Sequence, residues 1–286
     1  MALEACLAAL AVQSLPPLEV LVVLRDGDEA SRAIVDLAGE HVRSATVDRP
    51  GMVAALNRGR ELARGDIIAF TDDDAQPHQD WLQRVADLFA SDPTIGAVGG
   101  RDFVHYGART QTGSADPVGR VRWWGRRIGN HHLGTRIQDV DFLKGVNMAV
   151  RVEALRPFDD RLRGDGAQVA VDLEATWSIR RRGWRVVYDP AIAVQHYPAP
   201  RHDDDTRQSP SMRAVLNAEH NDLYALLRHA AWWHRPVLFT YAFLVGKRAT
   251  PGPLLAALPG IPPGRRSHVA RYAGARLAAL VTLLRR

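Results

Sequence analysis

Apolar and polar positions in the first hundred residues follow two alternating periods. Nearly unbroken apolar runs, typical of strands buried on both faces, occur at residues 18–24, 66–70 and 96–100, with a weaker one at 42–47. Apolar side chains at helical spacing occupy residues 2–12, 30–39, 52–63 and 81–90. This alternation predicts an α/β fold with a mainly parallel sheet flanked by helices.

The pattern changes after residue 100. Residues 105–140 have no sustained period and predict a long functional loop. A helix is expected from Val169 to Arg182, followed by strands at 184–188 and 191–196. The last segment, 268–286, mixes apolar and basic side chains at helical spacing, which is typical of an amphipathic helix.

Length and cysteine content narrow the class of protein. The chain has 286 residues, of which 46% are hydrophobic, enough for one large or two small domains. The single cysteine, Cys6, excludes an intrachain disulfide and a cysteine-based zinc site. No signal peptide or bilayer-spanning run is recognisable, so we expect a cytoplasmic protein with peripheral membrane contact at most.

Charge is distributed unevenly between two regions. Residues 223–286 contain ten basic and no acidic side chains, whereas residues 1–222 carry an excess of five acidic ones. An acidic body argues against nucleic acid as a partner, while a basic tail with Trp232 and Trp233 suits an anionic membrane surface. We therefore expect two regions, 1–222 and 223–286. Packing of the tail on the body, or a homodimer contact, remains an alternative.

Three adjacent carboxylates, Asp72, Asp73 and Asp74, follow the apolar strand at residues 66–70. Carboxyl ends of strands form the ligand-binding edge of such sheets, and clustered carboxylates repel one another unless a cation or donors offset them. The triplet thus indicates a Mg²⁺ or Mn²⁺ site suited to a diphosphate, with a solvated acidic turn as the alternative. His196 is a weak candidate ligand, and on the sequence alone a structural histidine is the favoured alternative. Asp172 and Glu174 form a second acidic pair at the start of a helix.

The order of these motifs resembles inverting family 2 glycosyltransferases with the GT-A fold. The resemblance covers roughly residues 1–200 and is carried by SLPPLEVLVVLRDGDEASR, GMVAALNRGRELARGDIIAFTDDDAQPHQDWLQRV, VGGRDF, FLKGVNMAVRVEAL and VDLEATWSIRRRGWRVVYDPAIAVQH. It implies a GT-A domain, a nucleotide-sugar donor (UDP-, GDP- or dTDP-linked) and transfer to an acceptor hydroxyl.

The resemblance also assigns donor-binding residues. Asp26 lies in the turn that contacts the nucleotide base, and Asn57 belongs to the segment that precedes the metal-binding strand. Asp72 and Asp73 are assigned to the donor, with Asp72 approaching the ribose. Asp74, together with Asp72 and His196, is assigned to the metal.

Catalysis is assigned to the second acidic pair. Asp172 takes the place of the general base that deprotonates the acceptor hydroxyl, and Glu174 that of a residue holding the acceptor. Val171 replaces the glutamate usual before this aspartate, so Asp165 is an alternative base. Leu24 stands where the family often has an aspartate.

The family's first strand is missing, because the sequence begins at the helix that follows it. Part of the wall that binds the base is therefore expected to be missing as well. The acceptor is expected to be a glycan or a lipid-linked glycan precursor, reached by docking of residues 223–286 on the cytoplasmic leaflet. Two alternatives are a nucleotidyltransferase and a catalytically degenerate module that binds the membrane surface.

Overall fold

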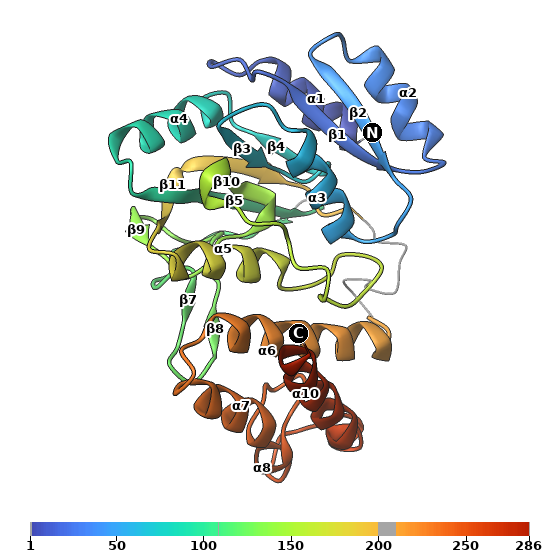
Figure 1. Ribbon diagram of the computed structural model, residues 1–286, viewed down its shortest axis with the longest axis vertical. Helices are drawn as coiled ribbons and strands as arrows, with labels where there is room; N and C mark the ends of the chain where they lie inside the picture. Colours follow the sequence, from blue (N-terminus) through green and yellow to red (C-terminus); the bar gives the residue numbers. More distant parts are fainter. Residues whose placement is uncertain (1, 108, 200–209, 286) are drawn as a thin grey trace.

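The computed structural model describes residues 2–107, 109–199 and 210–285. A central sheet lies between helical layers, and the carboxyl-terminal helices gather at one end of the molecule, far from α2 (Figure 1). Within the described residues, no helix is both long and apolar enough to cross a bilayer.

The elements agree closely with the periods of the sequence. The longer helices are α1 (Ala2–Ala11), α2 (Glu29–Leu37), α3 (Met52–Leu62), α4 (Trp81–Ser91), α5 (Val171–Arg181), α6 (Met212–His229), α7 (Arg235–Leu244) and α10 (Val269–Leu284). Two single turns, α8 (Pro253–Ala256) and α9 (Pro263–Arg266), begin at prolines. The longer strands are β1 (Val20–Arg25), β2 (Val42–Val47), β3 (Ile67–Phe70), β5 (Ile95–Tyr106), β10 (Met148–Arg151) and β11 (Arg185–His196).

The segment at 105–140 contains only short strands. These are β6 (Arg109–Thr110), β7 (Arg120–Val121), β8 (Arg127–Ile128) and β9 (Gln138–Asp139), and a further short strand, β4 (Ala75–Pro77), follows the acidic triplet. β7 and β8 pair as a hairpin that extends toward α7 (Figure 1). The expected irregular segment is thus folded back onto the domain rather than a free loop.

The main sheet has the strand order β3-β10-β5-β11-β4. β5 and β11 are parallel, and β3 runs in the same direction as β5 because β10, between them, is antiparallel to both. β1 and β2 form a separate parallel pair. The predicted α/β architecture is confirmed, with β10 and β4 running opposite to β3, β5 and β11.

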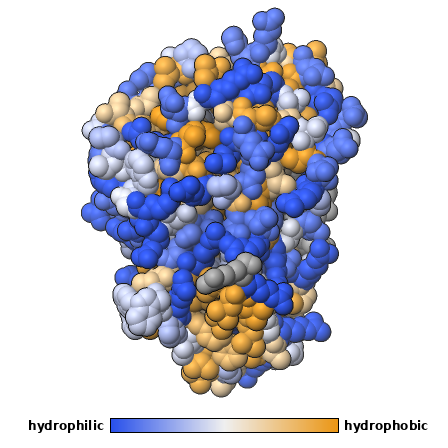
Figure 2. Space-filling model, in the orientation of Figure 1, coloured by the Kyte–Doolittle hydropathy of each residue, from blue (hydrophilic) through white to orange (hydrophobic). Residues whose placement is uncertain are grey.

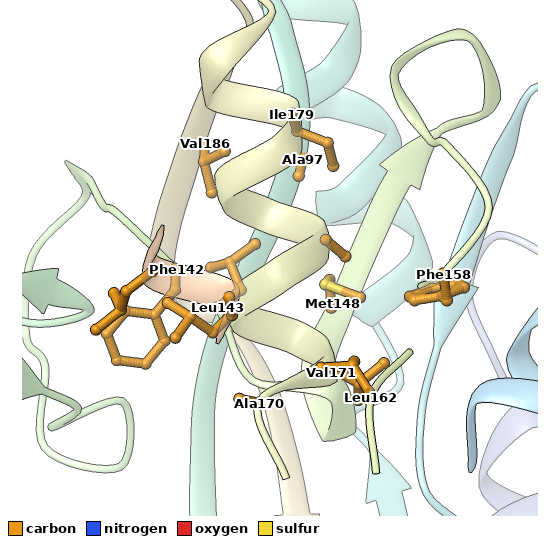
Figure 3. Packing of buried hydrophobic residues seen from close by; sticks show 14 of the residues in the cluster. Ala97, Phe142, Leu143, Met148, Phe158, Leu162, Ala170, Val171, Ile179 and Val186 are labelled. Carbon is orange, nitrogen blue, oxygen red and sulfur yellow. The ribbon is translucent and has the colours of Figure 1, made fainter. Parts of the chain in front are cut away.

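Helix α5 covers one face of this sheet (Figure 3). Val171 and Ile179 on α5 and Met148 and Ala97 on the strands belong to the largest cluster of buried apolar residues. The continuous apolar runs of β10 and β11 are explained by this burial on both faces. α4 covers the opposite face through Trp81 and Phe89.

Residues 185–196 form one strand instead of the two expected. β11 pairs with β5 along its length, and the register shifts between Asp189 and Ala193. At this shift the backbone approaches Gly100 so closely that a Cβ there would lie 1.7 Å from the Ile192 carbonyl oxygen. Only glycine fits, and the bulge lets the strand continue past Pro190.

The predicted boundary between residues 222 and 223 falls inside α6. Leu223 and Leu227 belong to the same core as α5, so α6 is part of the core of region 1–222. α10 packs along α6, and its Arg276 is 1% exposed and donates to Glu219 at 2.6 Å. The tail is therefore packed on the body, and Arg276 is a buried ion-pair partner. Arg286 lies outside the described residues.

Candidate functional site

β3 delivers the acidic triplet to one edge of the sheet. The strand ends at Phe70, and the backbone turns so that the Ala75 amide donates to the Asp72 carbonyl at 3.1 Å. The turn leads into β4, which pairs with the last residues of β11 and brings His196 opposite Ala75. Strand register thus brings two segments more than 120 residues apart to the same place.

Asp74 and His196 are both buried and face each other. His196 Nε2 lies 3.2 Å from Asp74 Oδ1, and the exposed fractions of the two residues are 8% and 7%. The other carboxylate oxygen of Asp74 accepts from the Ala199 amide at 2.8 Å. One ligand atom from each of Asp72, Asp74 and His196 lies within 4.8 Å of the others.

This arrangement fits a divalent cation. Both ring nitrogens of His196 are buried and make no hydrogen bond with the described residues. Burying an imidazole without partners is unfavourable, and a cation bound to Nε2 would supply one. Two carboxylates and an imidazole suit Mn²⁺ well, because this ion accepts both oxygen and nitrogen ligands.

Besides burial, the negative charge of the triplet raises the pKa of Asp73 and of the Cys6 thiol. Burial and the neighbouring Asp74 raise the pKa of Asp73. Burial and then the charges of Asp73, Asp72 and Asp74 raise the pKa of the Cys6 thiol to about 12. Cys6 is thus a neutral thiol, donating to the Asp72 carbonyl at 3.6 Å, and not a nucleophile.

Asp172 lies at the same edge of the sheet as the triplet. Its carboxylate accepts from the Leu173 amide at 2.8 Å and from the Gly145 amide. Gly145 begins the turn that enters β10, whose Met148 pairs with Phe70 at the end of β3. Burial raises the pKa of Asp172, with Arg127, these amides and Lys144 acting in the opposite direction.

Arg127 and Lys144 were not singled out from the sequence. Lys144 donates to the fully buried Asp102 at 2.6 Å, and Arg127 pairs with Asp222 at 2.7 Å. The positive charges of both side chains act to lower the pKa of Asp172. Their acidic partners are distant in sequence, so no local pattern reveals them.

Glu174 points away from this edge, into the interface between α5 and α6. It is 4% exposed, and its carboxylate accepts from His229 Nε2 at 2.7 Å and lies 3.4 Å from Arg228 Nε. In this structure Glu174 joins α5 to α6 through these contacts. Its expected role in holding the acceptor stays a prediction.

Asn57 is likewise engaged in holding the fold. Its side-chain amide donates to the Phe158 carbonyl at 2.9 Å, and its side-chain oxygen accepts from the Phe158 amide at 2.8 Å. Both ends of the amide are occupied, so the expected contact of Asn57 with the donor is not supported. Asn57 instead connects α3 to the segment before α5.

At the end of β1, Asp28 rather than Asp26 borders the main cavity. Asp26 is exposed, whereas Asp28 lines the cavity and caps α2 by accepting from the Ser31 amide at 3.1 Å. Asp165, the alternative base, pairs at the surface with Arg213 at 2.9 Å. The buried Asp172 is the stronger candidate.

Residues 2–213 match the model of a family described as "Glycosyltransferase like family 2". Two curated relatives come from Haloferax volcanii. The Glucosyl-dolichyl phosphate glucuronosyltransferase is 24% identical over 193 residues, which are 64% of this chain and 60% of the relative. Glycosyltransferase AglE is 29% identical over 174 residues, 57% and 54% of the two chains. The chain thus spans less than two thirds of the length of either relative.

Solved structures share the fold at low sequence identity. S. aureus TarS 1-349 in complex with UDP-GlcNAc has a TM-score of 0.63 at 13% identity, covering 97% of this chain and 77% of TarS. GalNAc-T7 with UDP, GalNAc and Mn²⁺ has a TM-score of 0.60 at 15% identity, covering 92% and 48%. These likenesses confirm the predicted GT-A fold.

Proposed function

The chain belongs to the glycosyltransferase-like family 2, and from this premise we propose that it is an inverting, metal-dependent glycosyltransferase. It would transfer a sugar from a UDP-, GDP- or dTDP-linked donor to a hydroxyl of a glycan or lipid-linked acceptor. The observation that supports this best is the group of Asp72, Asp74 and His196, of which both carboxylates line the main cavity.

In this proposal the donor lies at the carboxyl edge of the sheet. Asp72, Asp74 and His196 would hold Mn²⁺ or Mg²⁺, which neutralises charge on the departing diphosphate. The cavity of about 830 Å³ opens beside them and continues past Asp28 and Ser31, which leaves room for a nucleotide. The two similar solved structures contain UDP with Mn²⁺ and UDP-GlcNAc, and these ligands support this class of donor.

Asp172 would be the general base. Two backbone amides fix its carboxylate, and its raised pKa favours uptake of a proton from the acceptor hydroxyl. The attack opposite the leaving diphosphate inverts the anomeric configuration. The positive charges of Arg127 and Lys144 oppose the effect of burial and favour the ionised carboxylate.

Product analysis tests this activity against its alternatives. The chain is incubated with Mn²⁺, a panel of sugar nucleotides, and free or polyprenyl-phosphate-linked sugars as acceptors. Release of nucleoside diphosphate that depends on acceptor and metal is the expected result. Release of pyrophosphate indicates a nucleotidyltransferase, and the absence of both release and donor-dependent thermal stabilisation indicates a degenerate module.

We further propose that the end of the molecule formed by α7 and α10 docks on anionic membranes. Figure 2 shows an apolar area over α10 at this end, where Leu277, Val281 and Leu284 are 47%, 46% and 72% exposed. Trp232 and Trp233, before α7, are 80% and 65% exposed. The same carboxyl-terminal region has five exposed arginines; they are Arg248, Arg265, Arg266, Arg271 and Arg285.

Such a face suits the cytoplasmic leaflet, because tryptophans prefer headgroup depth and each arginine contributes about 1 kcal/mol near an anionic surface. It would bring the active site to a lipid-linked acceptor. The name of the glucuronosyltransferase relative, which includes a dolichyl phosphate, supports this acceptor class. A homodimer through the same face is the competing explanation for the exposed leucines.

Vesicle co-sedimentation distinguishes the two explanations. Deletion of the tail would remove part of the core, because α6 and α10 pack together, so point variants are used instead. Leu284→Glu should weaken binding to phosphatidylglycerol vesicles. Leu37→Glu, at an 88% exposed position on α2, is the matched control and should leave binding unchanged. Binding should also weaken with added salt. Loss of a dimer in Leu284→Glu, with no vesicle binding by the parent chain, refutes docking.

A further inference from the structure

The hairpin formed by β7 and β8 carries two tryptophans at its tip, beside α7 (Figure 1). Its loop, residues 123–125, ends in Gly125, whose φ of 95° suits the last position of a three-residue hairpin loop. A Cβ on Gly125 would lie 3.2 Å from Cδ2 of Leu238 on α7, so the tip is in close contact with that helix. The Trp123 carbonyl also forms a hydrogen bond with Nε2 of His234, just before α7. The tip is therefore held in place by the helical region.

An apolar groove of about 580 Å³ lies between this tip, α7 and α8, which is a volume typical of small-molecule sites. Its lining includes Trp124 of the hairpin, Tyr241 and Leu244 of α7, and Leu254 of α8. The ring centroids of Trp124 and Tyr241 are 6.2 Å apart. None of the described residues that line the groove is charged, and Leu254 is 58% exposed. A hydrocarbon ligand in the groove would remove this apolar surface from water.

Two arginines face each other across the hairpin next to the groove. The Arg122 amide donates to the Arg126 carbonyl at 2.8 Å, which continues the pairing of β7 with β8, and both side chains are exposed. Like charges at opposed positions of two strands repel each other, and a bound anion would offset this repulsion. The tip thus combines an uncharged groove with a doubly positive edge. This combination favours a hydrocarbon chain that ends in a phosphate over an apolar peptide.

The hairpin also leads from the groove toward the proposed base. Arg127 of β8 pairs with Asp222 of α6 at 2.7 Å, and its positive charge opposes the effect of burial on Asp172. Trp124 and Arg127 are three positions apart, so their Cα atoms are at most about 11 Å from each other. On the other side, the tip contacts His234, which directly follows the exposed tryptophan pair of the proposed membrane face. A ligand in the groove would have access to both regions.

We propose that this groove binds the hydrocarbon chain of a lipid-phosphate acceptor, with the phosphate beside Arg122 and Arg126. The inference rests on the proposed function, because it names the residues that would hold the lipid portion of the acceptor. The hydrocarbon chain would leave the bilayer at the face formed by α7 and α10 and lie against Trp124 and Leu254. A sugar joined to the phosphate would extend along β8 toward Asp172.

Binding of farnesyl phosphate, a soluble single-chain lipid phosphate, tests the hydrocarbon part of the proposal. Tryptophan fluorescence and isothermal titration measure its affinity for the full chain without donor or metal. Leu254→Glu places a charge in the groove and should weaken binding by about tenfold or more. Leu258→Glu is the matched control, because Leu258 is 54% exposed, close to the 58% of Leu254, and is not among the residues that line the groove. It should leave the affinity near that of the parent chain.

The phosphate part is tested with the two arginines. Arg122→Gln and Arg126→Gln should each weaken the binding of farnesyl phosphate by about fivefold, since each removes one positive charge near the anion. The affinity for farnesol, which has the same hydrocarbon chain and no phosphate, should not change in either variant. Equal losses for farnesol and farnesyl phosphate overturn the assignment of the phosphate to this edge.

Three results overturn the proposal as a whole. They are the absence of saturable binding by the parent chain, equal affinities in Leu254→Glu and Leu258→Glu, and equally tight binding of dihexanoyl phosphatidic acid, which would make the groove a site for bilayer phospholipid. A dimer of the parent chain that Leu254→Glu dissociates also overturns it, because the groove would then bind a second copy.

Failure of this inference and failure of the proposed function give different results. A chain that transfers sugar to free acceptors but does not bind farnesyl phosphate refutes the lipid groove and retains the proposed function. A chain that binds farnesyl phosphate through Leu254 but transfers sugar to no acceptor refutes the proposed function instead.

Discussion

His196 Nε2 lies 3.2 Å from Asp74 Oδ1, between two buried side chains that are 122 positions apart. The pairing of β4 with β11 sets this distance, because His196 lies opposite Ala75 in the ladder. The histidine ring makes no hydrogen bond to the described residues, and Asp72 lies beside it. The geometry leads to a direct prediction about metal binding.

Asp74→Asn should abolish stabilisation by Mn²⁺ and lower transfer activity by orders of magnitude, because a charged oxygen ligand is lost. His196→Gln should weaken Mn²⁺ binding less, since it removes a neutral ligand. Isothermal titration with Mn²⁺ alone, and thermal unfolding with and without Mn²⁺, measure both effects. Asp73, which is not part of the group of candidate ligands, provides a control, as Asp73→Asn should retain most of the response. Unchanged Mn²⁺ affinity in Asp74→Asn would exclude this metal site.

Asp172→Asn should reduce the turnover number by about 10²–10⁴ while donor affinity stays near that of the parent chain. The variant keeps the shape of the side chain but cannot accept a proton. Rate and donor affinity are measured separately, by nucleoside diphosphate release and by titration. A parallel loss of both would identify a structural role, and Asp165→Asn would then be tested as the base.

The acid limb of the pH–rate profile should lie above the usual aspartate pKa of about 3.9. Burial raises the pKa of Asp172, and the base must be ionised, so activity falls as the pH falls through this raised value. Arg127 lowers the same pKa, hence Arg127→Gln should move the limb to still higher pH. If the acid limb of Arg127→Gln stays at the pH of the parent chain, the limb reports the ionisation of a group other than Asp172.

Glu219→Gln should lower the free energy of unfolding by about 3–5 kcal/mol, because it leaves a buried guanidinium without its counter-charge. Arg276 is 1% exposed, and both its Nε and an Nη nitrogen donate to Glu219. Urea denaturation measures the change. Asp80→Asn, which breaks an exposed pair with Arg84 at 2.6 Å, is the control and should change stability by less than about 1 kcal/mol. Equal effects would show that α10 contributes little to the core.

The sequence by itself determined most elements and the edge of the sheet at which the acidic triplet lies. Apolar period is a local property, so the strand at Ile67–Phe70 and the helix at Val171–Arg181 were predicted to within a few residues. The position of the Asp72–Asp74 triplet after a buried strand follows equally from local order.

Tertiary structure decided what each polar side chain contacts. Glu174 and Asn57 bind partners 55 and 101 positions away, contacts that no local pattern indicates. Arg276 belongs to a helical stripe that the sequence presents as basic surface, but packing of α10 on α6 buries it against Glu219. Strand register and helix packing act between distant segments, and periodicity within one segment carries no information about them.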